Sequence, residues 1–462
     1  MRLKKEGLSK GGFMKAIWRR SSALLLLGLL GMAALPAWPQ SQEFPVSTRT
    51  LKNGMKVLVQ PDHSIPNVAL YIFYRIGSRN EHPGTTGLSH FFEHMMFNGA
   101  KKYGPGDLDK VMEANGGSNN AYTTQNVTVY QDWFPRSALS LIYDIEADRI
   151  RDLTFDPKKI ASEREVVASE RRLSVDNNNF GLLDEQLWAS AFIAHTYQWP
   201  VVGWMSDIEH WTMDDLKHHF EMGYSPSNAT MVVVGDISPE EIFELCEKFI
   251  EPISSHAPPP PVTTIEPEQL GERRLVVHKP AELPIVMIGY HIAQTNDPDF
   301  YALNILRSVL FQGESSRMYQ RLVDKDQLAL DVSSDVEPAF DPTLAIITAQ
   351  PRQSVDPGAC EKAIYEELDK VKGAPISDQE LEKAKNGRLV EFYREMRTIS
   401  GRANTIGTYE VFMGDYNKLF DTAKNYSAVT KDDVQRVAKK YFGANNRTVA
   451  TLLPDSEEKA KQ

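Results

Sequence analysis

The sequence has little cysteine and no long apolar run, and each shortage excludes a class of protein. Cysteine occurs only twice among 462 residues, at Cys246 and Cys360, which excludes a disulfide-stapled scaffold. Neither belongs to a C-x-x-C pair, and the pattern leaves open whether the two thiols pair or stay free and buried. No stretch reaches the ~20 apolar residues that a membrane-spanning helix needs. We therefore expect no transmembrane span in the mature chain.

Basic residues are also fewer than acidic ones. The chain has 51 Lys and Arg residues against 62 Asp and Glu residues, a net charge of −11. Seven of those basic residues and one acidic residue lie within residues 1–37, so the remainder carries −17. Because this negatively charged remainder would repel a polyphosphate, nucleic acid is excluded as an expected partner. Ordinary apolar content, 42%, argues against disorder, and the length suits two to four domains.

Residues 1–37 have the composition of an export signal. Basic residues precede a short apolar run from Ala23 to Ala34, and the small residues Ala33, Ala34 and Ala37 offer cleavage positions. This order is typical of a secretory signal peptide, and an N-terminal membrane anchor is the alternative. We expect a periplasmic or secreted protein, with the bacterial periplasm as the favoured location.

The rest of the chain reads as two units of similar size. Strand and helix patterns alternate over 45–252, a proline-rich linker covers 253–270 with four prolines at Pro258–Pro261, and the alternation restarts over 271–456. A tail follows at 457–462. Similar element order predicts an α+β fold of two homologous α/β domains, each a mainly antiparallel sheet packed with helices. The predicted elements include strands at Val68–Ile76, Thr124–Phe134, Ala229–Gly235, Ile285–Ile292, Leu344–Ala349 and Arg447–Leu453, a hairpin at Thr50–Gln60, and helices at Phe300–Leu310, Ser315–Val323, Asp378–Met396 and Lys431–Phe442.

The segment GLSHFFEHMMFNG, residues 87–99, carries the most specific signal. On a helix, His90 and His94 lie one turn apart, and Glu93 and Phe97 share their arc, with Gly99 as a stop signal. Two imidazoles can bind a metal ion, and a carboxylate beside them can act on a metal-bound water. H-x-x-E-H is the inverse of the H-E-x-x-H order and belongs with the zinc-peptidase motifs. The opposite face would pack in the core; it holds Leu88, Phe91, Phe92, Met95 and Met96.

A catalytic zinc needs a third protein ligand, and the helix pattern at 158–175 offers two candidates. Glu163 and Glu170 lie seven residues apart, on the predicted apolar arc of Ile160, Val166, Val167 and Leu173. Carboxylates in an apolar stripe require a cation or a donor. Pairing with arginines is the alternative, and periodicity alone does not separate Glu163 from Glu170 as the ligand.

Together these motifs resemble the pitrilysin/insulinase-type zinc metallopeptidases, especially the two-domain subunits typified by mitochondrial processing peptidase. HFFEH is followed 76 residues after His94 by Glu170, close to the spacing of that family's zinc-ligand glutamate. The resemblance runs from about residue 48 to 455. It also includes GSRNE at 77–81, GGSNNAYT at 116–123, HTYQWPVVG at 195–203 and YSPSNATMVVVGDI at 224–237.

The resemblance implies an active site in the first domain and a second domain without metal ligands. His90, His94 and Glu170 would hold one Zn²⁺ per chain, and Glu93 would act as the general base. Glu163 would orient the metal environment. Asn120 and Ala121 would lie on an edge strand that binds a peptide substrate through backbone hydrogen bonds.

One departure from the family pattern predicts a partner. Active relatives supply an Arg and, seven residues later, a Tyr from the opposite half of a clamshell, to grip the substrate. In the matching stretch Ser315–Asp331 these positions hold Val323 and Leu330. Arg317, Tyr319 and Arg321 lie nearby without that spacing. The chain would therefore be the zinc-bearing subunit of a heterodimer whose homologous second chain supplies the Arg/Tyr pair.

Two other functions compete with an exported zinc endopeptidase. A non-catalytic scaffold of the same fold would not need an intact metal triad. A different H-x-x-E-H enzyme, such as the ribosylhomocysteine lyase, is a much shorter single domain and leaves the second half of the chain unexplained.

Overall fold

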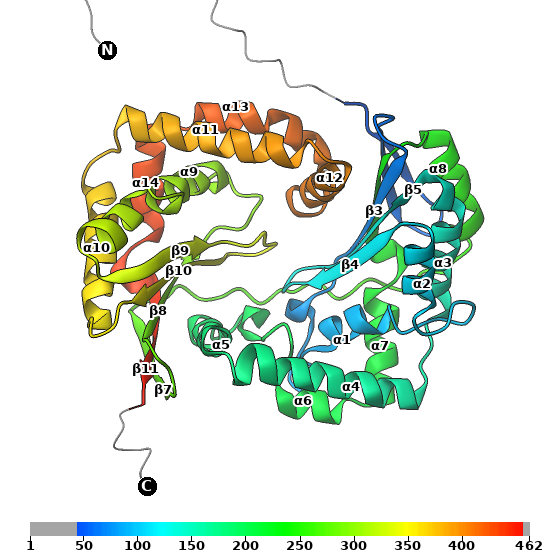
Figure 1. Cartoon of the computed structure of the whole chain (residues 1–462), viewed down its shortest axis with the longest axis horizontal. Helices are drawn as coiled ribbons and strands as arrows, with labels where there is room; N and C mark the ends of the chain where they lie inside the picture. The colour runs from blue at the N-terminus through cyan, green and yellow to red at the C-terminus, as the bar shows by residue number, and fades with distance from the viewer. Residues whose placement is uncertain (1–43, 456–462) are drawn as a thin grey trace, which may run out of the picture. The chain divides into compact units, whose positions relative to one another are not determined.

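Two β-sheets organise the part of the chain that the computed structural model describes, residues 44–455 (Figure 1). The first sheet has the order β1-β2-β6-β3-β5-β4 and the second has the order β7-β11-β8-β10-β9. All neighbouring strands are antiparallel except one parallel pair in each sheet, β2 with β6 and β7 with β11. The strands are β1 Ser47–Thr50, β2 Lys56–Pro61, β3 Asn67–Tyr74, β4 Ser118–Thr123, β5 Thr128–Pro135, β6 Ala229–Gly235, β7 Arg273–Lys279, β8 Ile285–Ile292, β9 Ala329–Asp335, β10 Thr343–Pro351 and β11 Arg447–Pro454.

The two sheets repeat one topology. In sheet order, β2-β6-β3-β5-β4 corresponds to β7-β11-β8-β10-β9, and the parallel pair falls at the same place in both. In chain order, a helix follows β3 as another follows β8, and a pair of helices follows β5 as another follows β10. This repetition confirms the predicted α+β fold of two homologous, mainly antiparallel units.

Helices of each half pack on the sheet of the other half (Figure 1). Helix α5 comes from the first half, yet its Leu183 and Leu187 are buried in a cluster with β8 and β11 residues. Helix α12 comes from the second half and packs against β3 and β6, where its Ile406 joins Tyr71 in another cluster. The helices are α1 Leu88–Met95, α2 Asp107–Ala114, α3 Leu139–Asp152, α4 Pro157–Arg171, α5 Asn179–Ala191, α6 Met205–His210, α7 Met213–Gly223, α8 Pro239–Leu245, α9 Phe300–Phe311, α10 Pro357–Gly373, α11 Asp378–Glu395, α12 Ile399–Met413, α13 Thr422–Ala428 and α14 Lys431–Tyr441.

Most of the predicted elements are present, and the errors are local. The hairpin, the strands β3, β6, β8, β10 and β11, and the helices α9, α11 and α14 lie where the pattern placed them. The strand predicted over Thr124–Phe134 begins only at Thr128, because residues 124–127 form the turn from β4. Where a helix is predicted over Ser315–Val323, the structure has a π-helix at Tyr319–Lys325. Strands β7 and β9 were not predicted, because their exposed charged and polar positions weaken the apolar signal.

The structure tests some of the remaining predictions, on the linker, the cysteines and a membrane span, and leaves others untested. Residues 254–270 contain no helix or strand, as a linker would, while the proposed domain boundaries stay a prediction. Cys246 and Cys360 are free and buried, so the two thiols do not form a disulfide. Among residues 44–455 no helix is long and apolar enough to cross a membrane. The predicted signal peptide and the tail at 457–462 lie outside the described residues.

Candidate active site

Helix α1 is fixed at its first turn by a buried carboxylate. Glu81 accepts hydrogen bonds of 2.7 Å from the backbone N–H groups of Gly87 and Ser89, which satisfies donors that a helix start leaves open. Burial raises the pKa of Glu81 to about 7, against the lowering effect of these bonds. Gly87 has φ +90°, and a Cβ there would meet the carbonyl oxygen of Val202 at 2.5 Å. The GSRNE and HTYQWPVVG segments therefore position the helix that carries H-x-x-E-H.

The predicted core face of α1 is confirmed, whereas its C-terminal end was misjudged. The five apolar residues of that face are all buried. The helix ends at Met95, so Phe97 lies beyond it and packs with its ring tilted against that of Tyr130 instead of sharing the histidine arc. Gly99 is not the helix stop either. It has φ +97° in the following loop, where a Cβ would meet the backbone of Gly104 and Pro105 at 2.6 Å.

Helix α4 brings the two candidate glutamates to α1. Its inward side holds Ile160 and Val167, and buried Arg171 anchors it through an ion pair of 2.7 Å with Glu185. The predicted apolar stripe is wrong in part, because Val166 and Leu173 are 47% and 72% exposed. The carboxylates are consequently not sealed in a core. The side chain of Glu163 is 13% exposed and that of Glu170 is 43% exposed.

Three ligand atoms converge between α1 and α4. Suitable atoms of His90, His94 and Glu170 all lie within 4.8 Å of one another. His90 Nε2 is 3.5 Å from Glu170 Oε1, and His94 Nε2 is 3.2 Å from Glu170 Oε2. Two ligands of a tetrahedral zinc with bonds of ~2.0–2.1 Å lie about 3.4 Å apart, so both the spacing and the donor set fit Zn²⁺. Within residues 44–455 this is the one such metal-ligating group.

Glu163 contacts the far side of His94. Its Oε1 lies 2.8 Å from His94 Nδ1, and its Oε2 accepts a bond of 2.6 Å from Asn98 Nδ2. Burial lowers the pKa of His94, but the bonds to Glu163 and Glu170 outweigh it and raise that pKa to about 9. A carboxylate on Nδ1 fixes the ring and leaves Nε2 for a metal. Neither glutamate pairs with an arginine in the described chain, so the alternative of arginine pairing is wrong.

Glu93 is held beside the metal-ligating group by the edge strand. Thr123 at the end of β4 donates a hydrogen bond of 2.6 Å from Oγ1 to Glu93 Oε2. Sequence reasoning missed both Thr123 and Asn98. Asn98 lies four residues after His94, and Thr123 ends the GGSNNAYT segment, so spacing and motif offered a signal for each.

Asn120 and Ala121 lie in β4, at one end of the first sheet. Ala121 pairs with Tyr130 and Asn120 with Gln131, both in β5. Among the described strands β4 has no second neighbour, so one side of its backbone is unpaired. Asn120 is exposed, and Ala121 is half-buried. This is the edge-strand placement that the resemblance implied; substrate binding there is still a prediction.

The second half has no side-chain hydrogen-bond donor at the two positions where the family pattern has an Arg and a Tyr. Val323 is buried, and Leu330 is exposed on β9, at the end of the second sheet. Arg317 pairs with Glu380 at 2.6 Å, and Arg321 pairs with Asp326 and Glu366.

The comparison with known proteins decides the family. A model described as insulinase, peptidase family M16, matches residues 56–203, and one described as the M16 inactive domain matches residues 210–388. The chain belongs to peptidase family M16. This M16 chain is 32% identical to the zinc protease PqqE of Helicobacter pylori over 88% of its own length and 92% of the relative's. It is 24% identical to a zinc protease of Bacillus subtilis, YmxG, over 85% and 95% of the two lengths.

Solved structures support the same assignment. The crystal structure of a protease from Helicobacter pylori matches this M16 chain with a TM-score of 0.86 and 31% identity, over 89% of this chain and 100% of the other. The periplasmic protease PqqL from Escherichia coli shares the fold at a TM-score of 0.73 and 20% identity, over 93% of this chain and 49% of PqqL. Membership of a zinc-protease family is therefore shown, while catalysis by this chain is a separate question.

Proposed function

We propose that this chain is an exported, zinc-dependent endopeptidase that hydrolyses peptides or unfolded chains. The observation that carries the proposal is the convergence of His90, His94 and Glu170, with Glu93 held beside them by the edge strand. Relatives named as zinc proteases support the reaction class. Export rests on the composition of residues 1–37.

Each residue of the site then has a distinct task. His90, His94 and Glu170 would hold one zinc ion per chain, which when bound lowers the pKa of a water and polarises the scissile carbonyl. Glu93 would take a proton from the attacking water and deliver it to the leaving amine, with Thr123 fixing its carboxylate. Glu163 would keep His94 oriented through Nδ1.

The peptide would extend β4. Its unpaired edge offers the backbone N–H and C=O groups of alternate residues in the strand that holds Asn120 and Ala121, close in the chain to Thr123, which contacts Glu93. Backbone pairing of this kind binds an extended segment with little demand on its sequence. It suits an enzyme that accepts unfolded chains.

A homologous subunit would complete the site. Val323 and Leu330 have no side-chain donor, and Arg317 and Arg321 are engaged in ion pairs. An Arg/Tyr pair from a second chain would supply the missing donors, in a heterodimer in which this chain holds the zinc.

A non-catalytic scaffold is the competing function, and metal content with activity separates the two. The purified protein should contain about one zinc per chain and cleave a quenched generic peptide in the presence of its partner. His94→Ala should lose both properties, because it removes a ligand. A zinc-free wild-type protein that assembles with a homologue but cleaves nothing would favour the scaffold.

A further inference from the structure

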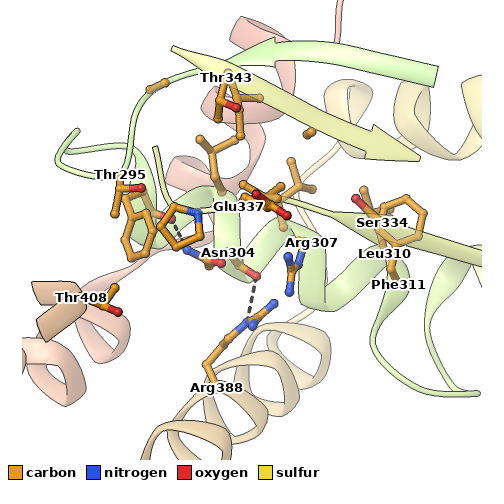
Figure 2. Close-up of a pocket in the computed structure, with 18 of the residues that line it drawn as sticks. Thr295, Asn304, Arg307, Leu310, Phe311, Ser334, Glu337, Thr343, Arg388 and Thr408 are labelled. Carbon is orange, nitrogen blue, oxygen red and sulfur yellow. Dashed lines mark hydrogen bonds between the residues drawn. The ribbon is translucent and has the colours of Figure 1, made fainter. Parts of the chain in front are cut away.

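A cavity of about 330 Å³ lies within the second half of the chain (Figure 2). Its walls come from the end of β8, helix α9, the connection from β9 to β10, and helices α11 and α12. The volume falls in the range of small-ligand pockets, with room for about ten water-sized groups. Much of the wall is apolar; it includes Ile292, Leu303, Leu306, Leu310, Phe311 and Met413.

The helices that flank the cavity repeat those of the metal site. In chain order α9 corresponds to α1, and α11 corresponds to α4. Where α1 and α4 carry histidines and glutamates, α9 and α11 direct Arg307 and Arg388 to the cavity. The duplicated unit thus places two guanidinium groups where the first unit places imidazoles and carboxylates.

Arg307 has no partner of its own. In residues 44–455 its side chain makes no ion pair within 4.0 Å and no hydrogen bond. Arg388 is engaged differently: its Nε donates to Ser308 Oγ at 2.6 Å, and its Nη1 donates to Glu391 at 3.0 Å. The two guanidinium groups face the same space (Figure 2). Burial, with the charge of Arg388 added, lowers the pKa of Arg307, although the more distant carboxylates of Asp335 and Glu391 act in the opposite direction.

Acceptors also line the cavity. Glu337 and Glu395 line it and are both exposed to solvent, and neither forms an ion pair with Arg307 or Arg388. Exposed carboxylates accept hydrogen bonds from N–H donors. An unpaired guanidinium, apolar walls and solvent-facing acceptors together match one group: the last residue of a peptide, with an α-carboxylate, an apolar side chain and a backbone N–H.

We propose that this cavity binds the free C-terminal end of a peptide whose last residue is apolar, with its carboxylate on Arg307. The site would hold an end of a substrate or product through contacts that do not involve the metal site. Binding here does not depend on zinc or on hydrolysis, so it can be tested apart from the proposed peptidase activity.

The test is peptide binding to a full-length Glu93→Gln protein, which is expected not to cleave the probe. The probe is a fluorescein-labelled Ala-Ala-Leu-Phe, as the free acid and as the C-terminal amide, measured by fluorescence polarisation. The acid should bind at least about ten-fold more tightly than the amide, the effect of one charge-assisted hydrogen bond. Arg307→Gln should remove that preference, and Arg307→Lys should retain part of it.

The matched control is Arg394→Gln, an exposed position on α11 that does not line the cavity. It should leave the preference for the acid unchanged. Thermal melting of each variant confirms folding. Equal affinity for acid and amide, or a preference that survives Arg307→Gln, would overturn the proposal. Arg307-dependent binding of decanoate without binding of the peptide acid would also overturn it, and would identify a free fatty acid as the ligand.

Discussion

At the scale of single residues, His94 lies between two carboxylates with different tasks. Glu163 contacts Nδ1 and is tied to Asn98, whereas Glu170 faces the Nε2 atoms of both histidines. In the proposed site the two glutamates of this helix have different tasks: Glu163 would orient a ligand, and Glu170 would be one.

Changing Glu163 to Gln should weaken zinc binding without abolishing it. The amide would still contact His94 but would not support it with a charge, and such indirect supports typically contribute ~10–100-fold in affinity. Glu170→Gln should lose most of the zinc. Competition with a chelator gives both values. Complete zinc loss in Glu163→Gln with retention in Glu170→Gln would reverse the two assignments.

His219 predicts how stability responds to acid. It is buried, bonds to Ser89 at 3.1 Å and stacks on Phe92, and burial lowers its pKa to about 3. Between pH 3 and the unfolded value of about 6.5, the unfolded chain binds more protons, so the free energy of unfolding falls as pH is lowered. In metal-free protein, His219→Gln should show a shallower loss of Tm from pH 7 to pH 5. Equal slopes for both proteins would contradict this.

The identities of the candidate site residues could be predicted from the sequence better than the packing and contacts that position them. The spacing of His90, Glu93 and His94 needs only a helix, which the apolar face of α1 ensures. The prediction of Glu170 rests partly on an apolar stripe of which only Ile160 and Val167 are buried, since Leu173 and Val166 are exposed. Contacts of Thr123 and Asn98 depend on how loops meet helices, which periodicity does not report.

At the scale of elements, the exchange of α5 and α12 between the sheets was not predictable. Neither helix has a strongly one-sided apolar face, and nothing local shows which sheet each will cover. The predicted strands fared better wherever both faces are buried, as in β3 and β6. Strand β7 alternates half-buried and exposed positions, so its signal is weaker.

Gly407 tests the packing of α12 on the first sheet. A Cβ at this position would lie 2.1 Å from the Phe73 ring, which is buried in β3. Gly407→Ala should therefore destabilise the fold by about 1–3 kcal/mol through overpacking. Gly373→Ala is the control, because a Cβ there meets nothing within 4 Å, and it should stay within about 0.5 kcal/mol of wild type. Denaturant unfolding measures both, and an unaffected Gly407→Ala protein would contradict the packing.

At the scale of the whole molecule, the two units share one topology, yet among residues 44–455 only the first carries a metal-ligating group. The first unit retains His and Glu on α1 and α4, whereas the second has Arg307 and Arg388 on the corresponding helices. The two units therefore carry different side chains on one architecture, and we propose that the first cleaves while the second binds.

The partner hypothesis predicts that the single chain is a poor enzyme. Loss of donors that stabilise the transition state typically costs ~10²–10³ in rate. Adding the product of a neighbouring homologous gene that carries the Arg/Tyr pair should raise kcat/KM by about that factor. Size-exclusion chromatography of the mixture should show a heterodimer. Full activity of the chain alone would reject the partner and leave the zinc assignment intact.

The most direct test of the central claim is the Glu93→Gln variant, assayed for zinc content and peptide cleavage in the same preparation. Glu93 is assigned as the base and not as a ligand, so the variant should keep about one zinc per chain and lose nearly all hydrolysis. Retained cleavage would show that Glu93 is not the base. Loss of zinc together with activity would show that Glu93 belongs to the metal-binding set, and either result would contradict the proposed site.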